Sequence, residues 1–166
     1  MKPETRFGHW LLGVLPKGDY SRVEPPPSPG IPDLNFCISG VEGWIELKVL
    51  RKGRFPFAKR FLRTSQKRWI RIRHRNRGRV FVLAKDGDYM VIWRGIDAVR
   101  VTASTSREDA IAIAIARLRA YRSETLTQHL KYILTMDILE GSWKSPSSIF
   151  KEWVSTSRPV GPTNPP

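Results

Sequence analysis

Cysteine is nearly absent from this chain: among its 166 residues there is one, Cys37. One cysteine cannot form an intrachain disulfide, and it also excludes a zinc site built from several cysteines. Disulfides persist in oxidising compartments, so their exclusion fits a reducing, intracellular setting.

Long apolar runs are absent too. No stretch approaches the roughly 18 to 20 apolar residues that a membrane-spanning helix needs. Residues 1–18 contain too short an apolar stretch, and no small-residue cleavage pattern, for a signal peptide. We therefore predict a cytoplasmic protein without membrane association. A chain of this length can bury one sizeable core, and a second full domain is not expected.

Acidic residues are missing from residues 47–85, whereas residues 51–79 contain 13 Lys or Arg. The whole chain has a net charge of +14 and a pI near 10.6. Uncompensated like charges repel each other and attract anionic polymers, so we favour nucleic-acid contact over a merely solvated basic face. The residues predicted to bind DNA are Arg51, Lys52, Arg54, Lys59, Arg60, Arg63, Lys67, Arg68, Arg71 and Arg75.

Apolar periodicity and turn signals predict a chain of alternating helices and strands. Apolar residues at three- and four-residue spacing indicate helices, alternating ones indicate strands, and Asp86-Gly87 is a strong hairpin signal. The first predicted elements are a helix from Pro3 to before Pro16 and a hairpin of strands 34–38 and 45–49. A helix follows from Thr64 or Ser65 to about Asn76, where Gly78 is placed to end it, and then a hairpin over 79–93 and a strand at 99–102. The last predicted elements are helices at 106–122, at 126–140 and from Ser145.

The order α-β-β-α-β-β-β, followed by helices, predicts a protein of the α/β class. We expect the core domain to cover residues 1–103 and a helical extension to cover 104–154. The remaining residues, 155–166, are rich in Pro, Ser and Thr and are expected to be disordered.

A capping box of Thr105 and Glu108 predicts the start of the helix at 106–122. This helix contains the alternating run AIAIAIA at 110–116. We expect the run to form helix core or a dimer contact rather than a chemical site.

A group of polar side chains lies just before the acid-free interval. Side chains alternate across a strand, so the apolar residues of 45–49 point into the core while Glu46 and Lys48 share the opposite face. The apolar residues of 34–38 point into the core in the same way, so Asp33 lies on the polar side. All three charged groups can therefore share one surface.

The turn of the first hairpin decides whether these groups also lie opposite one another. A two-residue turn at Ser39-Gly40 places Asp33 beside Glu46. A turn at Glu42-Gly43 moves Asp33 away, unless a bulge at a glycine restores the pairing. The sequence leaves both registers open.

If Asp33 and Glu46 converge, a divalent cation relieves their repulsion, and oxygen-only ligands favour magnesium or manganese. Lys48 can then orient water or neutralise charge in a transition state. The other explanation is a cross-strand salt bridge between Lys48 and either acid, which contributes only about 0 to 1 kcal/mol when exposed.

Four segments in order resemble the PD-(D/E)XK nuclease superfamily and, more narrowly, its VRR-NUC branch. They are GIPDL at 30–34, WIELK at 44–48, SQKRW at 65–69 and GRVFV at 78–82. The resemblance covers roughly residues 3–95 and implies a restriction-endonuclease-like core, in which helices flank a mixed sheet.

The resemblance also implies a phosphodiesterase that depends on Mg²⁺ or Mn²⁺. It assigns Asp33 and Glu46 as metal ligands and Lys48 as the catalytic lysine, and the backbone carbonyl of Leu47 completes the metal shell. These roles come from the match to the family pattern and not from the spacing of the residues.

Two further residues match family positions: Glu4 on the first helix and Gln66 on the helix after the lysine strand. Glu4 lies three residues before Phe7, on the inward stripe, but a helix dipole also favours an acid there and Glu24 is an alternative ligand. Gln66 lies one turn before Trp69, on the buried side, although a plain polar residue in the first turn is the alternative.

The combined prediction is a metal-dependent DNA endonuclease that is selective for structure, because no base-reading module is evident. Stand-alone proteins of this branch are similar to phage and bacterial Holliday-junction resolvases in DNA recombination and repair. Since a junction offers two symmetric strands, we expect a homodimer. The alternatives are a non-catalytic nucleic-acid-binding protein and a nicking or restriction nuclease.

Overall fold

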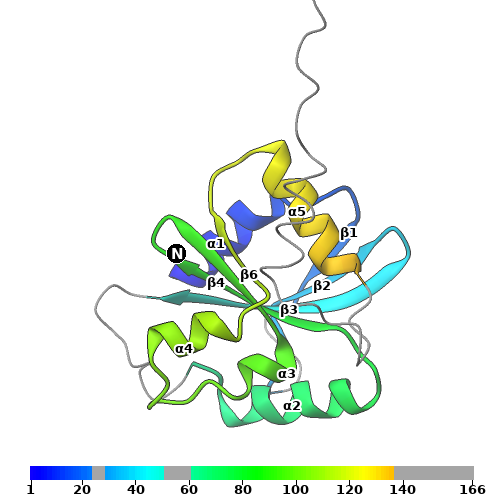
Figure 1. Cartoon of the computed structure of the whole chain (residues 1–166). Helices are drawn as coiled ribbons and strands as arrows, with labels where there is room; N and C mark the ends of the chain where they lie inside the picture. Colours follow the sequence, from blue (N-terminus) through cyan, green and yellow to red (C-terminus); the bar gives the residue numbers. More distant parts are fainter. Residues whose placement is uncertain (24–28, 51–60, 137–166) are drawn as a thin grey trace, which may run out of the picture. The chain divides into compact units, whose positions relative to one another are not determined.

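A six-stranded mixed sheet forms the centre of the molecule (Figure 1). The computed structural model describes residues 1–23, 29–50 and 61–136. Its elements in chain order are α1 (Pro3–Leu12), β1 (Asp19–Arg22), β2 (Leu34–Ile38), β3 (Val41–Leu50), α2 (Thr64–Arg75), β4 (Val80–Asp86), β5 (Tyr89–Arg94), α3 (Gly95–Ala98), α4 (Arg107–Ala112), β6 (Ala116–Arg119) and α5 (Glu124–Thr135).

The strands follow one another across the sheet from β1 to β6. Every neighbouring pair is antiparallel except β3 and β4, which are parallel. Parallel neighbours need a crossover connection, and α2 lies between β3 and β4 in the chain. In Figure 1, α1 and α5 cover one face of the sheet, and α2, α3 and α4 cover the other. The prediction of an α/β protein is therefore confirmed.

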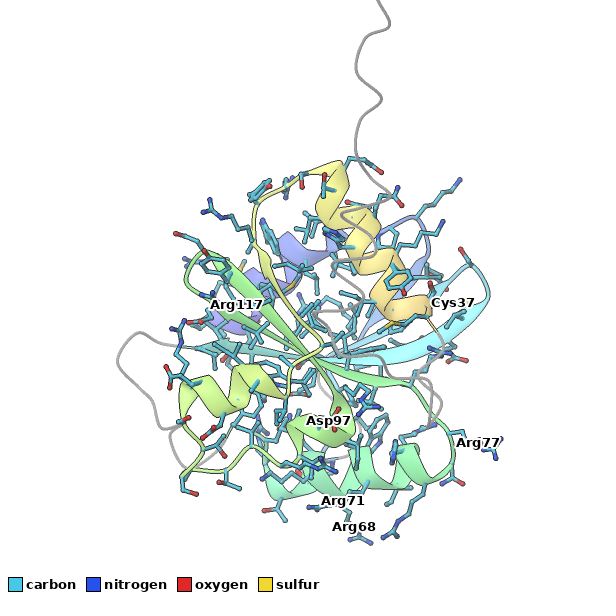
Figure 2. The ribbon with its side chains drawn as sticks, in the orientation of Figure 1. Cys37, Arg68, Arg71, Arg77, Asp97 and Arg117 are labelled. Carbon is cyan, nitrogen blue, oxygen red and sulfur yellow. The ribbon has the colours of Figure 1, made fainter. Side chains whose placement is uncertain are left out.

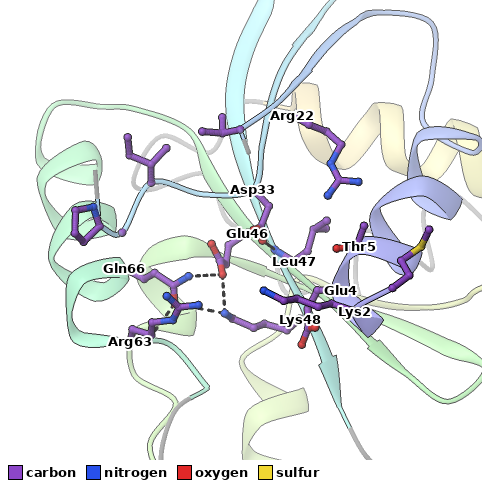
Figure 3. Close-up of a pocket in the computed structure, with 15 residues that line it drawn as sticks. Lys2, Glu4, Thr5, Arg22, Asp33, Glu46, Leu47, Lys48, Arg63 and Gln66 are labelled. Carbon is purple, nitrogen blue, oxygen red and sulfur yellow. Dashed lines mark hydrogen bonds and ion pairs between the residues drawn. The ribbon is translucent and has the colours of Figure 1, made fainter. Parts of the chain in front are cut away.

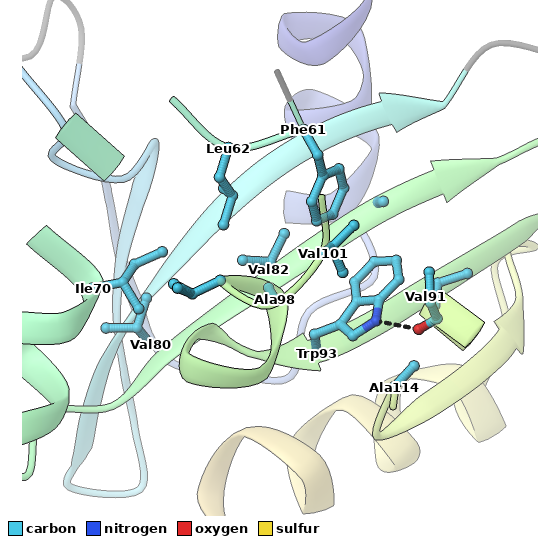
Figure 4. Close-up of a cluster of buried hydrophobic side chains, with 13 residues drawn as sticks. Phe61, Leu62, Ile70, Val80, Val82, Val91, Trp93, Ala98, Val101 and Ala114 are labelled. Carbon is cyan, nitrogen blue, oxygen red and sulfur yellow. Dashed lines mark hydrogen bonds between the residues drawn. The ribbon is translucent and has the colours of Figure 1, made fainter. Parts of the chain in front are cut away.

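Helices cover both faces of the sheet, so successive residues of the central strands β4 and β5, which point to opposite sides, are buried alike. On the side of α2 to α4, Trp93 lies in an apolar cluster (Figure 4). Its ring meets Phe61 edge to face, with 5.4 Å between the centroids, and its Nε1 donates a hydrogen bond to the Ala110 carbonyl at 2.7 Å. Alternate residues, such as the paired Ile45 and Phe81, form the core on the side of α1 and α5.

The first helix, both hairpins and the helix α2 are confirmed at nearly their predicted bounds. One detail of α2 differs: Gly78 was expected to end the helix, but Arg77 takes the left-handed conformation, with φ of 58°. The Gly78 amide then donates to the Arg73 carbonyl at 2.7 Å, which closes the last turn.

The strand β1 is missing from the predicted order. Its four residues are polar and alternate between exposed and half-buried positions, so they give no apolar signal. Pairing with β2, which places Asp19 opposite Cys37, makes this segment an edge strand.

The strand predicted at 99–102 is wrong. The amides of Val99 and Val101 donate to the carbonyls of Gly95 and Ala98, so this stretch extends the helical turn of α3. Both valines are buried, and their alternation reflects contact with the core rather than a strand.

The helix predicted at 106–122 is confirmed only over Arg107–Ala112, which form α4; the rest of that prediction is wrong. Ser106, rather than Thr105, caps the short helix α4 by accepting a hydrogen bond from the Asp109 amide at 3.0 Å. The chain then leaves the helix, and β6 pairs with β5, with Leu118 opposite Met90. An alternating Ala-Ile pattern has a period of two, which suits a strand as well as a helix.

Residues Met1–Met136 form one compact unit, which includes residues 107–136, where we predicted part of a helical extension. The helix predicted at 126–140 corresponds to α5, within the bounds that the structure describes. The helix predicted from Ser145 and the disordered tail lie outside the described residues. Within the described residues, no helix has the length and apolar character needed to cross a membrane.

Candidate functional site

The turn between β2 and β3 fixes the register that the sequence left open. Ser39 and Gly40 both have positive φ angles, 51° and 79°, as a two-residue hairpin turn requires. Leu34 pairs with Ile45, the register in which Asp33 falls beside Glu46. The turn at Ser39-Gly40 is therefore confirmed, and the alternative turn at Glu42-Gly43 is wrong.

Asp33, just before β2, is held against β3 by a main-chain hydrogen bond. The Leu47 amide donates to Asp33 Oδ2 at 2.8 Å. Gly30, with φ of 98°, lies so close to α2 that an added Cβ would be 2.5 Å from the Ser65 carbonyl oxygen. The Gly30 contact and the Leu47 bond together fix Asp33 between β3 and the start of α2.

Glu46 is the buried centre of the site, with 2% of its surface exposed. Its Oε1 accepts hydrogen bonds from Lys48 Nζ at 2.6 Å and from Gln66 Nε2 at 2.5 Å. Gln66 Oε1 in turn accepts from the Arg63 amide at 3.0 Å, which joins the site to the first turn of α2. The predicted placement of Gln66 on the buried side is confirmed.

The second oxygen of Glu46, Oε2, is buried and accepts no hydrogen bond from any residue that the structure describes. Burial raises the pKa of Glu46 to about 7; Lys48 opposes this shift, and Asp33 adds to it. Burial also raises the pKa of Asp33, against the Leu47 amide and the charges of Lys48 and Arg22. Both carboxyl groups therefore lie where an extra positive charge is favourable.

A cleft with a volume of about 870 Å³ brings these residues together with the N-terminal part of α1. Figure 3 shows Asp33, Glu46 and Lys48 in this cleft, with Gln66 on α2 and Glu4 on α1. The residues that line it are Met1, Lys2, Glu4, Thr5, Arg22, Val23, Pro29, Gly30, Ile31, Asp33, Glu46, Leu47, Lys48, Arg63 and Gln66. Every residue predicted for the catalytic and metal site is among them.

Glu4 reaches the cleft differently from the prediction. We expected it to continue the inward stripe of the first helix, but it is exposed at the helix start. The stripe begins at Phe7, which is buried, because only from there does α1 cover the sheet. The alternative ligand, Glu24, lies outside the described residues.

The residues predicted to bind DNA divide into three groups. Arg63 lines the cleft, and Lys67 Nζ donates to the Val101 carbonyl at 3.3 Å, toward the interior. Three exposed arginines lie along α2: Arg68, Arg71 and Arg75. Figure 2 shows Arg68 and Arg71 pointing away from the sheet. The others lie outside the described residues: Arg51, Lys52, Arg54, Lys59 and Arg60.

The sequence did not predict Lys2, Thr5 and Arg22 as site residues, although all three line the cleft. Arg22 comes from β1, the strand that carried no apolar signal. Lys2 and Thr5 reach the cleft through the placement of α1 against β3. Gly8 permits that placement, since a Cβ on it would lie 3.0 Å from Leu47 Cδ1.

A divalent cation fits the donor set of the cleft. In residues 1–23, 29–50 and 61–136, no three His, Cys, Asp or Glu side chains gather as a metal site by themselves. The two carboxylates Asp33 and Glu46, however, supply hard oxygen donors, and the buried Glu46 Oε2 has the capacity to accept a cation. The Leu47 carbonyl and Glu4 are the further donors that the sequence predicts.

No protein-family model matches the chain, and no curated protein matches it either. A functional proposal therefore rests on the site itself. Its strongest features are the paired carboxylates, the lysine beside them and the basic charge around them.

Proposed function

We propose that this protein is a DNA endonuclease that depends on Mg²⁺ or Mn²⁺ and hydrolyses phosphodiester bonds in the cleft. One observation carries the proposal: Asp33 and the buried Glu46 lie side by side, with Glu46 Oε2 unbonded among the described residues and Lys48 2.6 Å from Oε1. A buried carboxylate with an unbonded oxygen is unfavourable for folding by itself, so a function for it is expected.

The metal would be held by Asp33, Glu46 and the Leu47 carbonyl, with Glu4 at the mouth of the cleft. When bound, such an ion polarises a phosphoryl oxygen and lowers the pKa of water. The mixed sheet with flanking helices is compatible with the restriction-endonuclease-like core that the sequence resemblance implies.

The residues of the chain have separate roles in this proposal. Lys48 places an ammonium group beside the reacting phosphate and neutralises the charge that develops there. Gln66 positions Glu46 by donating to Oε1, so that Oε2 remains available. Arg63, Lys2 and Arg22 give the cleft a positive lining that attracts the phosphate backbone.

Branched DNA is the substrate that we propose, because none of the described elements forms a separate base-reading module. A junction offers two equivalent strands, and cutting both symmetrically calls for a homodimer. Nicking of plasmid DNA without preference for a junction would instead indicate a restriction or nicking nuclease.

One observation favours a second candidate, a non-catalytic DNA-binding protein. Lys48 and Glu46 already form an ion pair, and an ion pair alone can be structural. That candidate leaves unexplained why two neighbouring carboxylates line a cleft in a protein whose partner is a polyanion.

The test uses the purified full chain with supercoiled plasmid and with a synthetic four-way junction, in Mg²⁺ or in EDTA. We expect cleavage in Mg²⁺ only, with symmetric cuts near the crossover and preference for the junction. Asp33→Asn and Lys48→Ala should lose at least about 100-fold in rate and still bind DNA. Glu42→Gln, a charge change at an exposed position on the same strand, should cleave normally.

A second measurement does not depend on activity. Binding of Mg²⁺ to the folded state should raise the melting temperature of the wild type, and Asp33→Asn should remove this effect. Tight DNA binding without cleavage in any divalent cation, together with no metal-dependent stabilisation, would establish the non-catalytic candidate instead.

A further inference from the structure

The helix α2 presents a row of arginines to solvent. Arg68, Arg71 and Arg75 are spaced by three and four residues, so they lie on one side of the helix. We call these three residues the outer arginine face. The helix contains no acidic residue that could compensate them.

The other sides of α2 are already in use. Gln66 and Ile70 are buried against the sheet, and Lys67 reaches the Val101 carbonyl. The Arg73 guanidinium stacks on the Trp69 ring at 4.7 Å from its centroid. The outer arginine face has no such role, and none of the ion pairs among the described residues includes it.

Like charges at these spacings destabilise a helix, so the outer arginine face works against folding in the absence of an anion. A polyanion that lies along the helix would remove the repulsion and use all three charges.

The outer arginine face lies on the helix whose start borders the cleft. Arg63 and Gln66 line the cleft, whereas Arg68, half a turn after Gln66, lies on the opposite side of α2. From Arg68 to Arg75 the helix rises by roughly 10 Å. One strand of double-helical DNA carries a phosphate about every 3.4 Å along its axis, so the three arginines span several consecutive phosphates.

We propose that the outer arginine face binds the phosphate backbone of a double-stranded DNA arm that lies along the outer side of α2, the helix whose start borders the cleft. The substrate would then be a strand flanked by duplex, and the contacts would position it without reading its sequence. This inference rests on the proposed function for the cleft, but the surface can be tested without any cleavage.

The experiment compares two triple variants that lose the same charge. Arg68→Ala/Arg71→Ala/Arg75→Ala removes the outer arginine face, and Lys17→Ala/Arg119→Ala/Lys131→Ala removes three exposed basic residues outside α2. Binding of a labelled duplex and of a single strand of the same length is measured by fluorescence anisotropy in EDTA, between about 50 and 200 mM salt.

We expect the first variant to bind the duplex at least about tenfold more weakly and to reduce the salt slope by roughly 2.7, because about 0.9 is lost for each phosphate contact. The control variant should stay within about twofold of the wild type, and single-strand binding should change less in both. The unliganded first variant should melt at the same or a higher temperature, because repulsion is removed and the fold retained.

Equal losses in the two variants would overturn the proposal, since they would indicate diffuse attraction. Equal losses for duplex and single strand would overturn it as well. Binding of anionic phospholipid vesicles is measured in the same way. If the first variant loses as much affinity for these vesicles as for duplex DNA, the outer arginine face binds a membrane surface and the proposal is wrong. If the proposed nuclease function fails, no DNA is cut in Mg²⁺, but the selective loss of duplex binding is still observed.

Discussion

Glu46 places a carboxyl group in the interior of the protein, and its surroundings only partly compensate for the loss of water. Lys48 and Gln66 bond one oxygen, while the other is buried without a hydrogen bond among the described residues. The neutral acid is therefore favoured in the folded state, and the pKa rises to about 7. At the scale of single residues, this gives the site a pH dependence that can be measured.

Without divalent cations, we expect the wild type to become less stable as pH rises from about 4.5 to about 7. In this range Glu46 keeps its proton in the folded state but has released it in the unfolded state. The resulting contribution to the free energy of unfolding is therefore complete only below the pKa of the unfolded state, and it is lost as pH rises through the folded pKa. The total loss is about 3 kcal/mol. Urea unfolding across this range should show the slope, and Glu46→Gln should reduce it.

Glu42→Gln is the control for this prediction, because Glu42 is exposed on the same strand. Its pH slope should equal that of the wild type. A wild-type stability that stays constant or increases between these pH values would contradict the raised pKa of the buried Glu46.

Gly30 gives a second prediction at the residue scale. Gly30→Ala should lower the free energy of unfolding by about 2 to 3 kcal/mol, because the backbone has a positive φ there and the added methyl group would clash with the backbone of Ser65. Gly40→Ala is the matched control: its φ is also positive, but nothing lies within 4 Å of an added Cβ. It should cost about 1 kcal/mol. Chemical denaturation of both variants compares them, and equal losses would show that the Gly30 contact does not matter.

At the scale of elements, α2 ends at a residue that is poorly suited to its conformation. Arg77 has φ of 58°, where a β-carbon is unfavourable and glycine is the usual residue. The turn is nevertheless closed by the amide of Gly78, which donates to the Arg73 carbonyl. The register of the helix end therefore determines which residue takes the strained position.

Arg77→Gly should consequently stabilise the protein by about 1 kcal/mol. Arg71→Gly removes the same charge from the interior of the helix and should destabilise the protein by about 1 kcal/mol. Thermal unfolding of the two variants distinguishes backbone strain from charge. Shifts of the same sign in both would indicate that charge dominates.

Elements with a distinctive apolar period were predictable, and those without one were not. The spacing of Phe7 and Leu11 indicated α1, and the turn at Gly87 indicated the second hairpin. The strands β1 and β6 were missed because the first is polar and the second follows an alternating run that suits either structure. Whether each segment becomes a strand depends on the strand it pairs with rather than on its local sequence.

At the scale of the whole molecule, the net charge of +14 dominates the electrostatics. Self-repulsion destabilises the compact state of such a protein, and at 0.1 M salt the repulsion between exposed charges more than about 10 Å apart is largely screened. DNA binding should respond in the opposite direction, because salt competes for the phosphates.

We therefore expect the melting temperature of the unliganded protein to rise by about 3 °C between low salt and about 0.2 M salt, while DNA affinity falls. Circular dichroism measures the first effect, and anisotropy measures the second. Removing the outer arginine face should reduce both responses. A melting temperature that falls with added salt would indicate that favourable ion pairs outweigh the repulsion.

From the amino-acid sequence we could predict the α/β class, the strand that carries Glu46 and Lys48, and the excess of basic residues around them. These features follow from local periodicity and composition, which do not depend on distant contacts. Three features required the folded structure: the hairpin register that brings Asp33 to Glu46, the entry of Lys2, Thr5 and Arg22 into the cleft, and the burial of Glu46. Each of these depends on which segments pack together, and packing energy is shared among residues far apart in the chain.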